Sequence, residues 1–206
     1  MKNSKSKISL GFTDQSFDQG VHICQIYNSE EERHDILYDF LVTGLEGGED
    51  VTIFSEEEIE ISLSDLLEEK GISCQREKTS DKLSLFKTGE IYFEDGKFDP
   101  EKILKLLRNF YEESQKRGRK GARVLGEMTP EIDNIPGGSR LLEYESKVSM
   151  LLRKYPVTTV CQYDSRQFDG STIMDILKVH PYMIVRGSVV QNPFFIQPEV
   201  YLSQYK

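Results

Sequence analysis

The 206-residue sequence predicts a three-layer α/β/α fold with a mostly parallel sheet. Three observations lead to this prediction. Short apolar runs alternate with longer segments whose apolar residues recur every three to four positions. Capping residues and glycines mark the ends of those longer segments, as they do in helices. The last two strand-like runs are separated by only two residues, which indicates an antiparallel hairpin at one edge of the sheet.

Seven short segments have the apolar composition of buried strands, and turn residues flank them. We place these strands at 21–27, 51–54, 83–86, 122–126, 157–163, 182–185 and 188–190. Helical segments separate the first five. Strands joined in this way run parallel and are covered by helices on both faces of the sheet.

Capping signals predict where the intervening helices begin. A serine followed three residues later by glutamate has the form of a capping box, and proline after aspartate suits the first helical position. The expected helix starts are Ser29 with Glu32, Ser55 with Glu58, Asp99-Pro100 and Ser139, whose helix runs to Lys154; a last short helix covers 171–179. Gly47-Gly48, Gly71 and Gly118 mark the expected helix ends.

The composition is that of a globular protein with one domain. Hydrophobic residues make up 37% of the chain and charged residues 30%, and no apolar run has the length of a membrane span. We expect residues 1–19 to be a flexible lead-in, because no apolar segment of a signal peptide follows the early lysines. Residues 20–206 then form the domain. Three cysteines without a CxxC pair suit a reducing compartment, so we expect a cytoplasmic protein without a membrane anchor.

The charge of the chain argues against nucleic acid as a partner. The formal net charge is -9, which repels phosphate backbones unless a basic face overcomes it. The richest basic stretch, at 116–120, lies between a helix and a strand and has no interleaved aromatic residues. We interpret it as a solvated turn.

Ligands of open parallel sheets bind beyond the carboxyl ends of the strands. The residues that follow the predicted strands there are polar or aromatic. They are Tyr27 with Asn28, Ser55 with Glu56, Glu127, and Tyr163 with Asp164. We expect the binding site at this end of the sheet.

The first strand-to-helix turn does not have the sequence of a phosphate-binding loop. Such a loop uses glycine amides and a lysine to hold the phosphates of a nucleotide. Here the turn at 27–32 reads YNSEEE, with three carboxylates where phosphate charge would lie. Asp164 after an apolar strand resembles the magnesium-binding aspartate of nucleotide hydrolases, but alone it is a weak signal. We therefore expect no nucleotide hydrolysis.

Several motifs occur in an order that resembles a known family. They are HICQIY at 22–27, FLVTGLEGGEDV at 40–51, GEIYFEDGKF at 89–98, RVLGEM at 123–128, YE at 144–145, CQYD at 161–164, HP at 180–181 and NPFF at 192–195. Together they resemble the methanogen and methylotroph sensory domain, MEDS, over residues 20 to 198. No single motif is decisive, but their order and spacing are specific.

The resemblance implies an α/β fold distantly similar to the RecA and KaiC cores but without a Walker A loop. It also implies a role in prokaryotic signal transduction, in which the domain senses simple hydrocarbon or one-carbon derivatives. Members of the family commonly join this domain to a helix-turn-helix, a kinase or another signalling module. We therefore expect the output of this chain to pass to a signalling protein partner or through a homo-oligomer.

Glu145 is a candidate because it falls on the apolar stripe of its helix, where an unpaired charge is costly. A structural pairing with Arg123 or Arg140 and a ligand contact are equally good interpretations. Tyr144 and Tyr163 could form the walls of an apolar pocket, but aromatic rings also fill cores.

Two histidines and two cysteines could form a metal site, but their positions in the sequence argue against it. His22 and Cys24 alternate onto one face of a strand, and Cys161 with His180 could complete a ligand set. However, both histidines precede their strands, at the end opposite the expected pocket, whereas Cys161 lies inside a strand. We therefore expect no metal and no cofactor, and we keep His22 and His180 only as candidates for ligand binding.

The main hypothesis from the sequence is a binding protein that is not an enzyme, since no nucleophile elbow, HExxH or Cys-His signature is present. Its small organic ligand contacts Tyr27, Glu127, Tyr144, Gln162, Tyr163 and Asp164, with Glu145, Arg123, His22 and His180 as further candidates. Two alternatives stay open. One is a degenerate RecA-like nucleotide-binding protein without hydrolysis, and the other is a structural adaptor that docks through the apolar NPFF segment.

Overall fold

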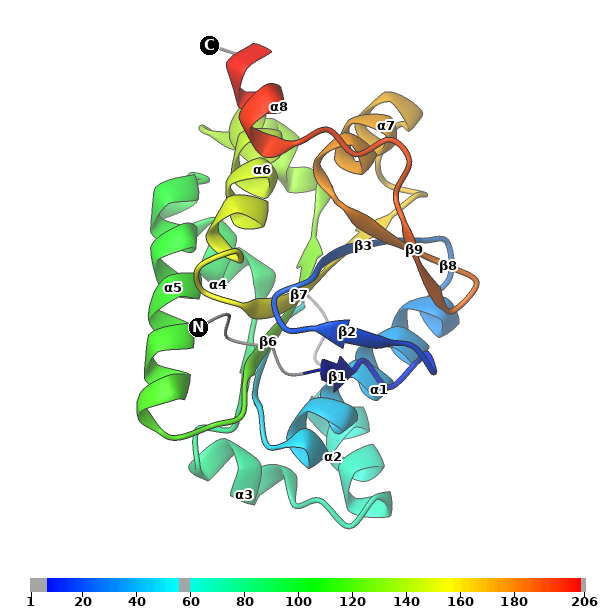
Figure 1. Cartoon of the computed structure of the whole chain (residues 1–206), viewed down its shortest axis with the longest axis vertical. Helices are drawn as coiled ribbons and strands as arrows, with labels where there is room; N and C mark the ends of the chain where they lie inside the picture. The colour runs from blue at the N-terminus through cyan, green and yellow to red at the C-terminus, as the bar shows by residue number, and fades with distance from the viewer. Residues whose placement is uncertain (1–6, 56–59, 205–206) are drawn as a thin grey trace.

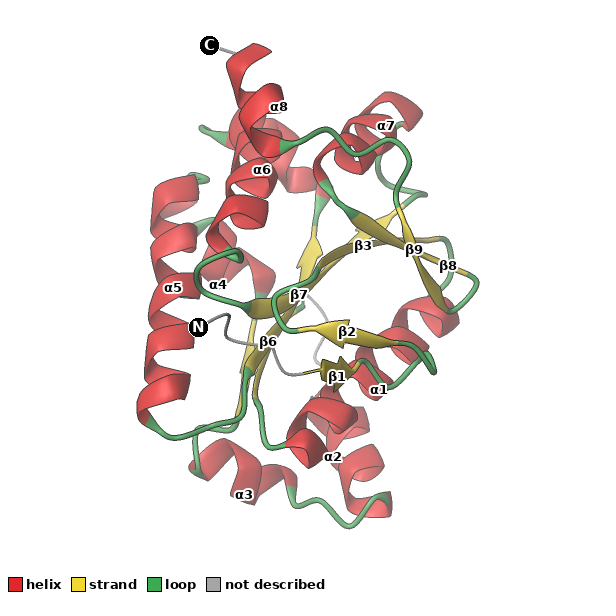
Figure 2. Cartoon of the chain, in the orientation of Figure 1, coloured by secondary structure: helices red, strands yellow, loops and turns green. Residues whose placement is uncertain are grey.

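The computed structural model describes residues 7–55 and 60–204, and it has the three layers that the sequence predicts (Figures 1 and 2). The central sheet has seven strands in the order β5-β4-β6-β7-β3-β8-β9. Their bounds are β5 Leu83–Phe86, β4 Asp50–Phe54, β6 Ala122–Met128, β7 Val157–Asp164, β3 His22–Tyr27, β8 Tyr182–Val185 and β9 Ser188–Gln191. All neighbours pair in parallel except β8 and β9, which form the predicted antiparallel hairpin at the edge.

Helices cover both faces of the sheet. The apolar residues of α1 (Glu30–Gly47), α2 (Glu60–Glu69) and α3 (Cys74–Thr79) pack in one core. Those of α4 (Thr88–Tyr92), α5 (Pro100–Lys116), α6 (Leu141–Leu151) and α7 (Gly170–Val179) pack in a second core on the opposite face, and α8 (Pro198–Gln204) lies beside α6. Three short 3-10 turns, at Glu94–Gly96, Pro130–Asn134 and Gly138–Arg140, complete the described elements.

Two predicted helix starts are confirmed by their caps. The Ser29 side chain accepts a hydrogen bond from the Glu32 amide, and that of Asp99 accepts one from the Lys102 amide. The predicted pair of Ser55 with Glu58 lies partly outside the described residues. Ser139 does not cap α6, because it lies within a 3-10 turn and the helix begins only at Leu141, after Arg140.

The N-terminal segment departs from the expected lead-in. β1 (Lys7–Ser9) and β2 (Ser16–Asp18) form a small antiparallel hairpin outside the main sheet. Ile8 and Leu10 are buried in the core under α1, and Leu10 has no exposed surface. The lysines around these two apolar residues gave the segment its polar appearance in the sequence, although its alternate residues point into the protein.

The basic stretch at 116–120 is also more than a solvated turn. Arg117 and Arg119 both contact the carboxylate of Asp50, at 3.1 and 2.8 Å, and the Asp50 side chain is fully buried. The two arginines compensate the buried negative charge of Asp50 at the amino end of β4. These two cations are therefore used to stabilise the fold.

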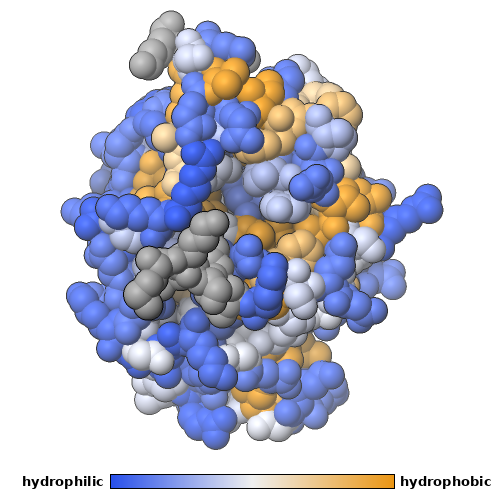
Figure 3. All heavy atoms as spheres, in the orientation of Figure 1, coloured by the Kyte–Doolittle hydropathy of each residue, from blue (hydrophilic) through white to orange (hydrophobic). Residues whose placement is uncertain are grey.

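Apolar residues reach the surface around α8 and along the side that carries β8 and β9 (Figure 3). The exposed ones there include Val185, Val190, Phe194 and Val200. Asn192, at the start of the proposed docking segment, is instead buried, and its amide donates to the carbonyls of Leu177 and His180. None of the helices in the two described ranges is long and apolar enough to cross a membrane.

Candidate functional site

The alternation of side chains along the strands divides the candidate residues between the two faces of the sheet. The face toward α1 carries Tyr27, Arg123, Glu127, Gln162 and Asp164, and the opposite face carries His22, Tyr144, Glu145, Tyr163 and His180. The prediction that all these residues line a single pocket is therefore wrong. Gln162 and Tyr163 are neighbours in β7, so they project to opposite faces.

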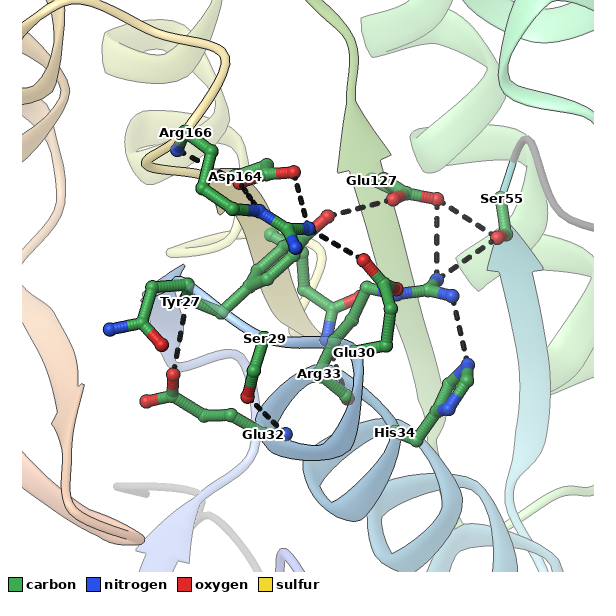
Figure 4. Close-up of polar contacts among 12 residues, drawn as sticks. Tyr27, Ser29, Glu30, Glu32, Arg33, His34, Ser55, Glu127, Asp164 and Arg166 are labelled. Atoms are coloured by element: carbon green, nitrogen blue, oxygen red, sulfur yellow. Dashed lines mark hydrogen bonds and ion pairs between the residues drawn. The ribbon is translucent and has the colours of Figure 1, made fainter.

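The first cluster, which we call the crest cluster, consists of Tyr27, Arg33, Ser55 and Glu127 and lies at the carboxyl ends of β3, β4 and β6 (Figure 4). The Tyr27 hydroxyl donates to Glu127 Oε1 over 2.9 Å. The Ser55 hydroxyl donates to Glu127 Oε2 over 2.9 Å, and Arg33 Nη1 lies 3.4 Å from the same oxygen. Donors from three different elements therefore converge on one carboxylate.

Arg33 is the member of the crest cluster that the sequence analysis missed. Its side chain is fully buried, and its Nε donates to Glu30 Oε2 over 2.8 Å. The helical periodicity could have found it, because positions 33, 36, 37, 40 and 41 form one stripe with the three-to-four spacing of a buried face. A charge on such a stripe needs partners, and the carboxylates of Glu30 and Glu127 provide them.

Asp164 lies next to the crest cluster but is paired with a second arginine. Arg166 donates from Nε to Asp164 Oδ1 over 2.8 Å and from Nη2 to Oδ2 over 2.7 Å. This bidentate contact, followed by smaller effects, holds the pKa of Asp164 at about 2. Arg166 Nη2 also donates to Glu30 Oε1 over 2.6 Å, so Glu30 bridges Arg33 and Arg166 (Figure 4).

The turn from β3 to α1 uses its own side chains to satisfy its amides. The Glu32 amide donates to Ser29 Oγ over 3.2 Å, and the Asn28 amide donates to Glu32 Oε2 over 3.2 Å. In phosphate-binding loops these are the groups that face the ligand. The contacts support the expectation that this turn does not hold a triphosphate.

Gln162 is buried below the crest and links three elements. Its amide donates to Gln25 Oε1 over 2.7 Å and to the Arg33 carbonyl over 3.1 Å. Gln25 in turn donates to the Glu32 carbonyl over 2.9 Å. These bonds fasten β7 and β3 to the first turns of α1, so Gln162 positions α1.

The second cluster, which we call the buried cluster, consists of His22, Glu145, Cys161, Tyr163 and His180 on the opposite face. Glu145 Oε2 lies 3.3 Å from His22 Nε2 and 3.5 Å from His180 Nε2. The Tyr163 hydroxyl donates to Glu145 Oε1 over 2.7 Å. Cys161 Sγ lies 3.5 Å from His22 Nε2 and 3.8 Å from Glu145 Oε2.

This arrangement corrects the expected pairing of Glu145. It does not pair with Arg123 or Arg140; its partners are the two histidines. Cys161 lies inside its strand, as expected, but it still reaches His22. The register of the parallel pair places Cys161 opposite Cys24, one step along the same face from His22, and the imidazole spans the remaining distance.

Burial controls the protonation of the buried cluster. Burial, and then the charge of His180, lower the pKa of His22 to about 4 against the opposing effect of the Glu145 carboxylate. Burial, and then the charge of Glu145, raise the pKa of the Cys161 thiol well above its usual value. His22 is therefore a neutral imidazole at neutral pH, and Cys161 is a thiol unless a cation replaces its proton.

Tyr144 is part of an aromatic group beneath the buried cluster. Its ring packs edge-on against Tyr92 and Phe98, with centroids 6.1 and 5.5 Å away. All three rings are buried. Tyr144 thus fills the core between α4 and α6, which was one of its two predicted roles.

Arg123 lies at the amino end of β6, far along the strand from Glu127. It pairs with Glu49, and its Nη1 donates to the Phe40 carbonyl over 2.8 Å. Its guanidinium also lies 4.7 Å from the centre of the Phe40 ring. Both charged side chains are buried, so Arg123 is a structural residue beneath α1.

Comparisons with known proteins agree with this fold. Residues 21–181 match the model of the family described as MEDS, the MEthanogen/methylotroph, DcmR Sensory domain. The transcriptional repressor DcmR of Methylorubrum extorquens is 25% identical over 160 residues, which are 77% of this chain and 57% of DcmR. The chain thus spans little more than half of that relative.

Two solved structures share the fold at low sequence identity. The flagellar accessory protein FlaH of Methanocaldococcus jannaschii has a TM-score of 0.64 and 12% identity, with 90% of this chain and 84% of FlaH covered. A KaiC-like protein of Pyrococcus horikoshii has a TM-score of 0.58 and 13% identity, with 87% and 79% covered. The RecA and KaiC-like architecture is thereby confirmed.

Proposed function

Because the chain belongs to the MEDS family of sensory domains, we propose that it binds a small organic molecule, of the class of simple hydrocarbon or one-carbon derivatives, and passes this signal to a partner protein or a second copy of itself. It acts by binding and does not turn its ligand over. The observation that carries the proposal is the crest cluster, in which Glu127 is held at the ligand-binding end of the sheet.

Glu127 suits recognition of a small molecule that has a hydroxyl or amine. Its carboxylate already accepts from Tyr27 and Ser55, and 12% of its side chain is exposed. A ligand that donates a hydrogen bond can therefore compete with the protein donors without creating a new buried charge.

The contacts of Arg33 provide a route from ligand to output. Arg33 joins Glu127 to Glu30, and Glu30 joins Arg166 in the loop after β7. A ligand that weakens the contact between Glu127 and Arg33 would alter the position of the first turn of α1 and of this loop. Such a ligand signals only if it binds one of the two arrangements more tightly.

The chemistry of Cys161 supports binding without turnover. Cys161 Sγ lies 3.5 Å from His22 Nε2, a distance typical of a nucleophile and its base. However, activated thiols have a lowered pKa, and here burial and Glu145 raise the pKa of Cys161. Both side chains are also buried.

The relative DcmR is named as a transcriptional repressor, and the matched region covers 57% of it. We propose by analogy that the sensory domain controls a separate output part. The apolar residues exposed beside β8 and β9 are candidates for that contact.

A thermal-shift screen tests the proposed function. Short alcohols, methylated amines and halogenated methanes are added to the wild type, to Glu127→Gln and to the exposed control Glu68→Gln. A ligand at 100 times its Kd stabilises the folded state by about 2.7 kcal/mol. We expect a compound that raises the Tm of the wild type and of Glu68→Gln but has a weaker effect on Glu127→Gln.

Two outcomes would contradict the proposal. A compound that stabilises all three proteins equally would place the site away from Glu127. Tight binding of ATP with magnesium, measured by calorimetry, would instead support a degenerate nucleotide-binding protein.

A further inference from the structure

Four side chains of the buried cluster place ligand atoms of three kinds around one point. They are His22 Nε2, Glu145 Oε2, Cys161 Sγ and His180 Nε2, and all lie within 4.8 Å of one another. Four of their separations are 3.3, 3.5, 3.5 and 3.8 Å. Ligand atoms at the usual bond lengths from a tetrahedral zinc ion lie roughly 3.3 to 3.8 Å apart. Four of the six separations therefore match those of a tetrahedral site, and the other two are at most 4.8 Å.

Nδ1 of each imidazole is engaged in a hydrogen bond, which leaves Nε2 as the atom that can bind a metal. His180 Nδ1 lies 2.8 Å from the Ile176 carbonyl, which can only accept, so Nδ1 carries the proton. His22 Nδ1 lies 2.8 Å from Ser149 Oγ, whose own proton points to the Val179 carbonyl over 3.4 Å. Histidines that bind metals have this arrangement, since an Nδ1–H donated outward fixes the tautomer.

His180 Nε2 provides a second, independent observation. It is buried and has no hydrogen-bond partner among the residues of the described ranges. Because Nδ1 faces the Ile176 carbonyl, Nε2 is the atom that faces Glu145 Oε2, 3.5 Å away. A cation bound between this nitrogen and the carboxylate would satisfy both buried atoms.

We propose that the buried cluster is a binding site for one divalent transition-metal ion, which His22, Glu145, Cys161 and His180 ligate through these four atoms. Imidazole, thiolate and carboxylate together favour zinc. The hydrogen bond from Tyr163 engages Glu145 Oε1 and leaves Oε2 for the metal. One thiolate and one carboxylate balance the charge of a divalent ion, as a site inside a core requires.

The position of the site provides access for an ion. A cavity of about 300 Å³ lies at the amino end of β3, and its walls include His22, Ser149 and Pro181. This end of the sheet is opposite to the crest cluster. The metal site therefore does not rest on the proposed ligand site, and either can exist without the other. Its closed set of protein ligands indicates a structural role, which joins β3, β7, α6 and the end of α7.

Metal analysis of the purified chain tests this proposal directly. The protein is expressed in medium that contains zinc, freed of loose metal by gel filtration, and measured by mass spectrometry of the elements. We expect one zinc ion per chain in the wild type and in Cys74→Ser, which changes a buried cysteine of the other core. We expect the content to fall at least tenfold in Cys161→Ser and in His180→Gln.

Cobalt substitution distinguishes ligation from mere retention of metal. Cobalt bound to the metal-free protein should give the strong visible bands of a tetrahedral ion and a thiolate charge-transfer band. Cys161→Ser should lose the charge-transfer band, and Glu145→Gln, which keeps the shape of the side chain, should weaken cobalt binding. Circular dichroism of each variant, and chelation of the wild type at native pH, control for loss of fold.

A folded wild type that contains no zinc and shows no thiolate band with cobalt would overturn the proposal. A proton shared between His180 and Glu145 would then account for the cluster. Retention of full metal content in folded Cys161→Ser and His180→Gln would likewise place the metal elsewhere.

Discussion

Tyr27 and Glu127 are joined by a hydrogen bond of 2.9 Å, although 100 residues separate them in the sequence and a whole strand separates them in the sheet. Tyr27 ends β3 and Glu127 lies near the end of β6, with β7 between them. Ser55, which follows β4, reaches the same carboxylate from the other side. The crest cluster therefore connects strands that are not neighbours.

Removal of the Tyr27 hydroxyl should weaken this connection. Tyr27→Phe keeps the ring but leaves Glu127 with one donor fewer, and we expect a loss of about 0.5 to 1.5 kcal/mol in the free energy of unfolding. Urea denaturation followed by circular dichroism measures it. Tyr155→Phe, which keeps the ring contacts with Tyr111 and Arg108, serves as the control. An unchanged stability would mean that solvent replaces the bond.

Gly44 of α1 has no room for a side chain, because Arg123 packs directly against it. Glycine inside a helix usually costs about 0.5 to 1 kcal/mol relative to alanine. A Cβ at Gly44, however, would lie 2.5 Å from Arg123 Cδ and 2.8 Å from Val51 Cγ2. We expect Gly44→Ala to destabilise the protein despite the better helix propensity, because it displaces the buried pair of Arg123 and Glu49.

The matched control is Gly47→Ala in the same helix. Its Cβ would meet only Glu49 Cγ, at 4.0 Å, which is ordinary contact. Thermal denaturation should give a lower Tm for Gly44→Ala and an equal or higher Tm for Gly47→Ala. Equal effects of the two substitutions would show that Arg123 can move aside.

Truncation of Leu10 tests whether the N-terminal hairpin belongs to the domain. Leu10 is fully buried under α1, and the carbonyl of the preceding Ser9 accepts from Arg123 Nη2 over 3.2 Å. Leu10→Ala should lower the free energy of unfolding by about 2 to 5 kcal/mol. Lys7→Ala, whose side chain is 65% exposed, should have little effect. If this segment were a flexible lead-in, neither substitution would change the free energy of unfolding.

The contact between α5 and α6 should make stability depend on acid pH. Glu101 and Glu143 share Arg140 and Lys147, and the hydrogen bonds from Arg140 are the main cause that holds the pKa of each carboxyl at about 2 rather than 4.5. The folded pKa is thus below the unfolded one. Their contribution to stability is complete above pH 4.5 and is lost as the pH falls toward 2.

Arg140→Gln should therefore flatten the fall in Tm over this pH range, and added salt should weaken the effect because the groups are partly exposed. Arg108→Gln, which breaks a separate exposed pair with Glu112, provides the comparison. If both variants follow the pH profile of the wild type, the α5 and α6 network does not cause the dependence.

Local signals in the sequence determined most of the secondary structure. The buried strands, the caps at Ser29 and Asp99 and the turn at Arg186-Gly187 depend on residues within a few positions of one another. The small hairpin at 7–18, the short helices α3, α4 and α8 and the delayed start of α6 were missed. The hairpin is stabilised by burial of Ile8 and Leu10 under a distant helix, and the 3-10 turn before α6 displaces the expected cap.

The sequence by itself also determined which residues can do chemistry, because a charged or polar residue on a buried stripe must find a partner. Only the tertiary structure decided which partners they find. The strand order places β7 between β3 and β6, and the alternation of side chains then sends Glu127 to one face and Cys161 to the other. Contacts such as His22 with Glu145 join segments over 100 residues apart, and no local pattern specifies that distance.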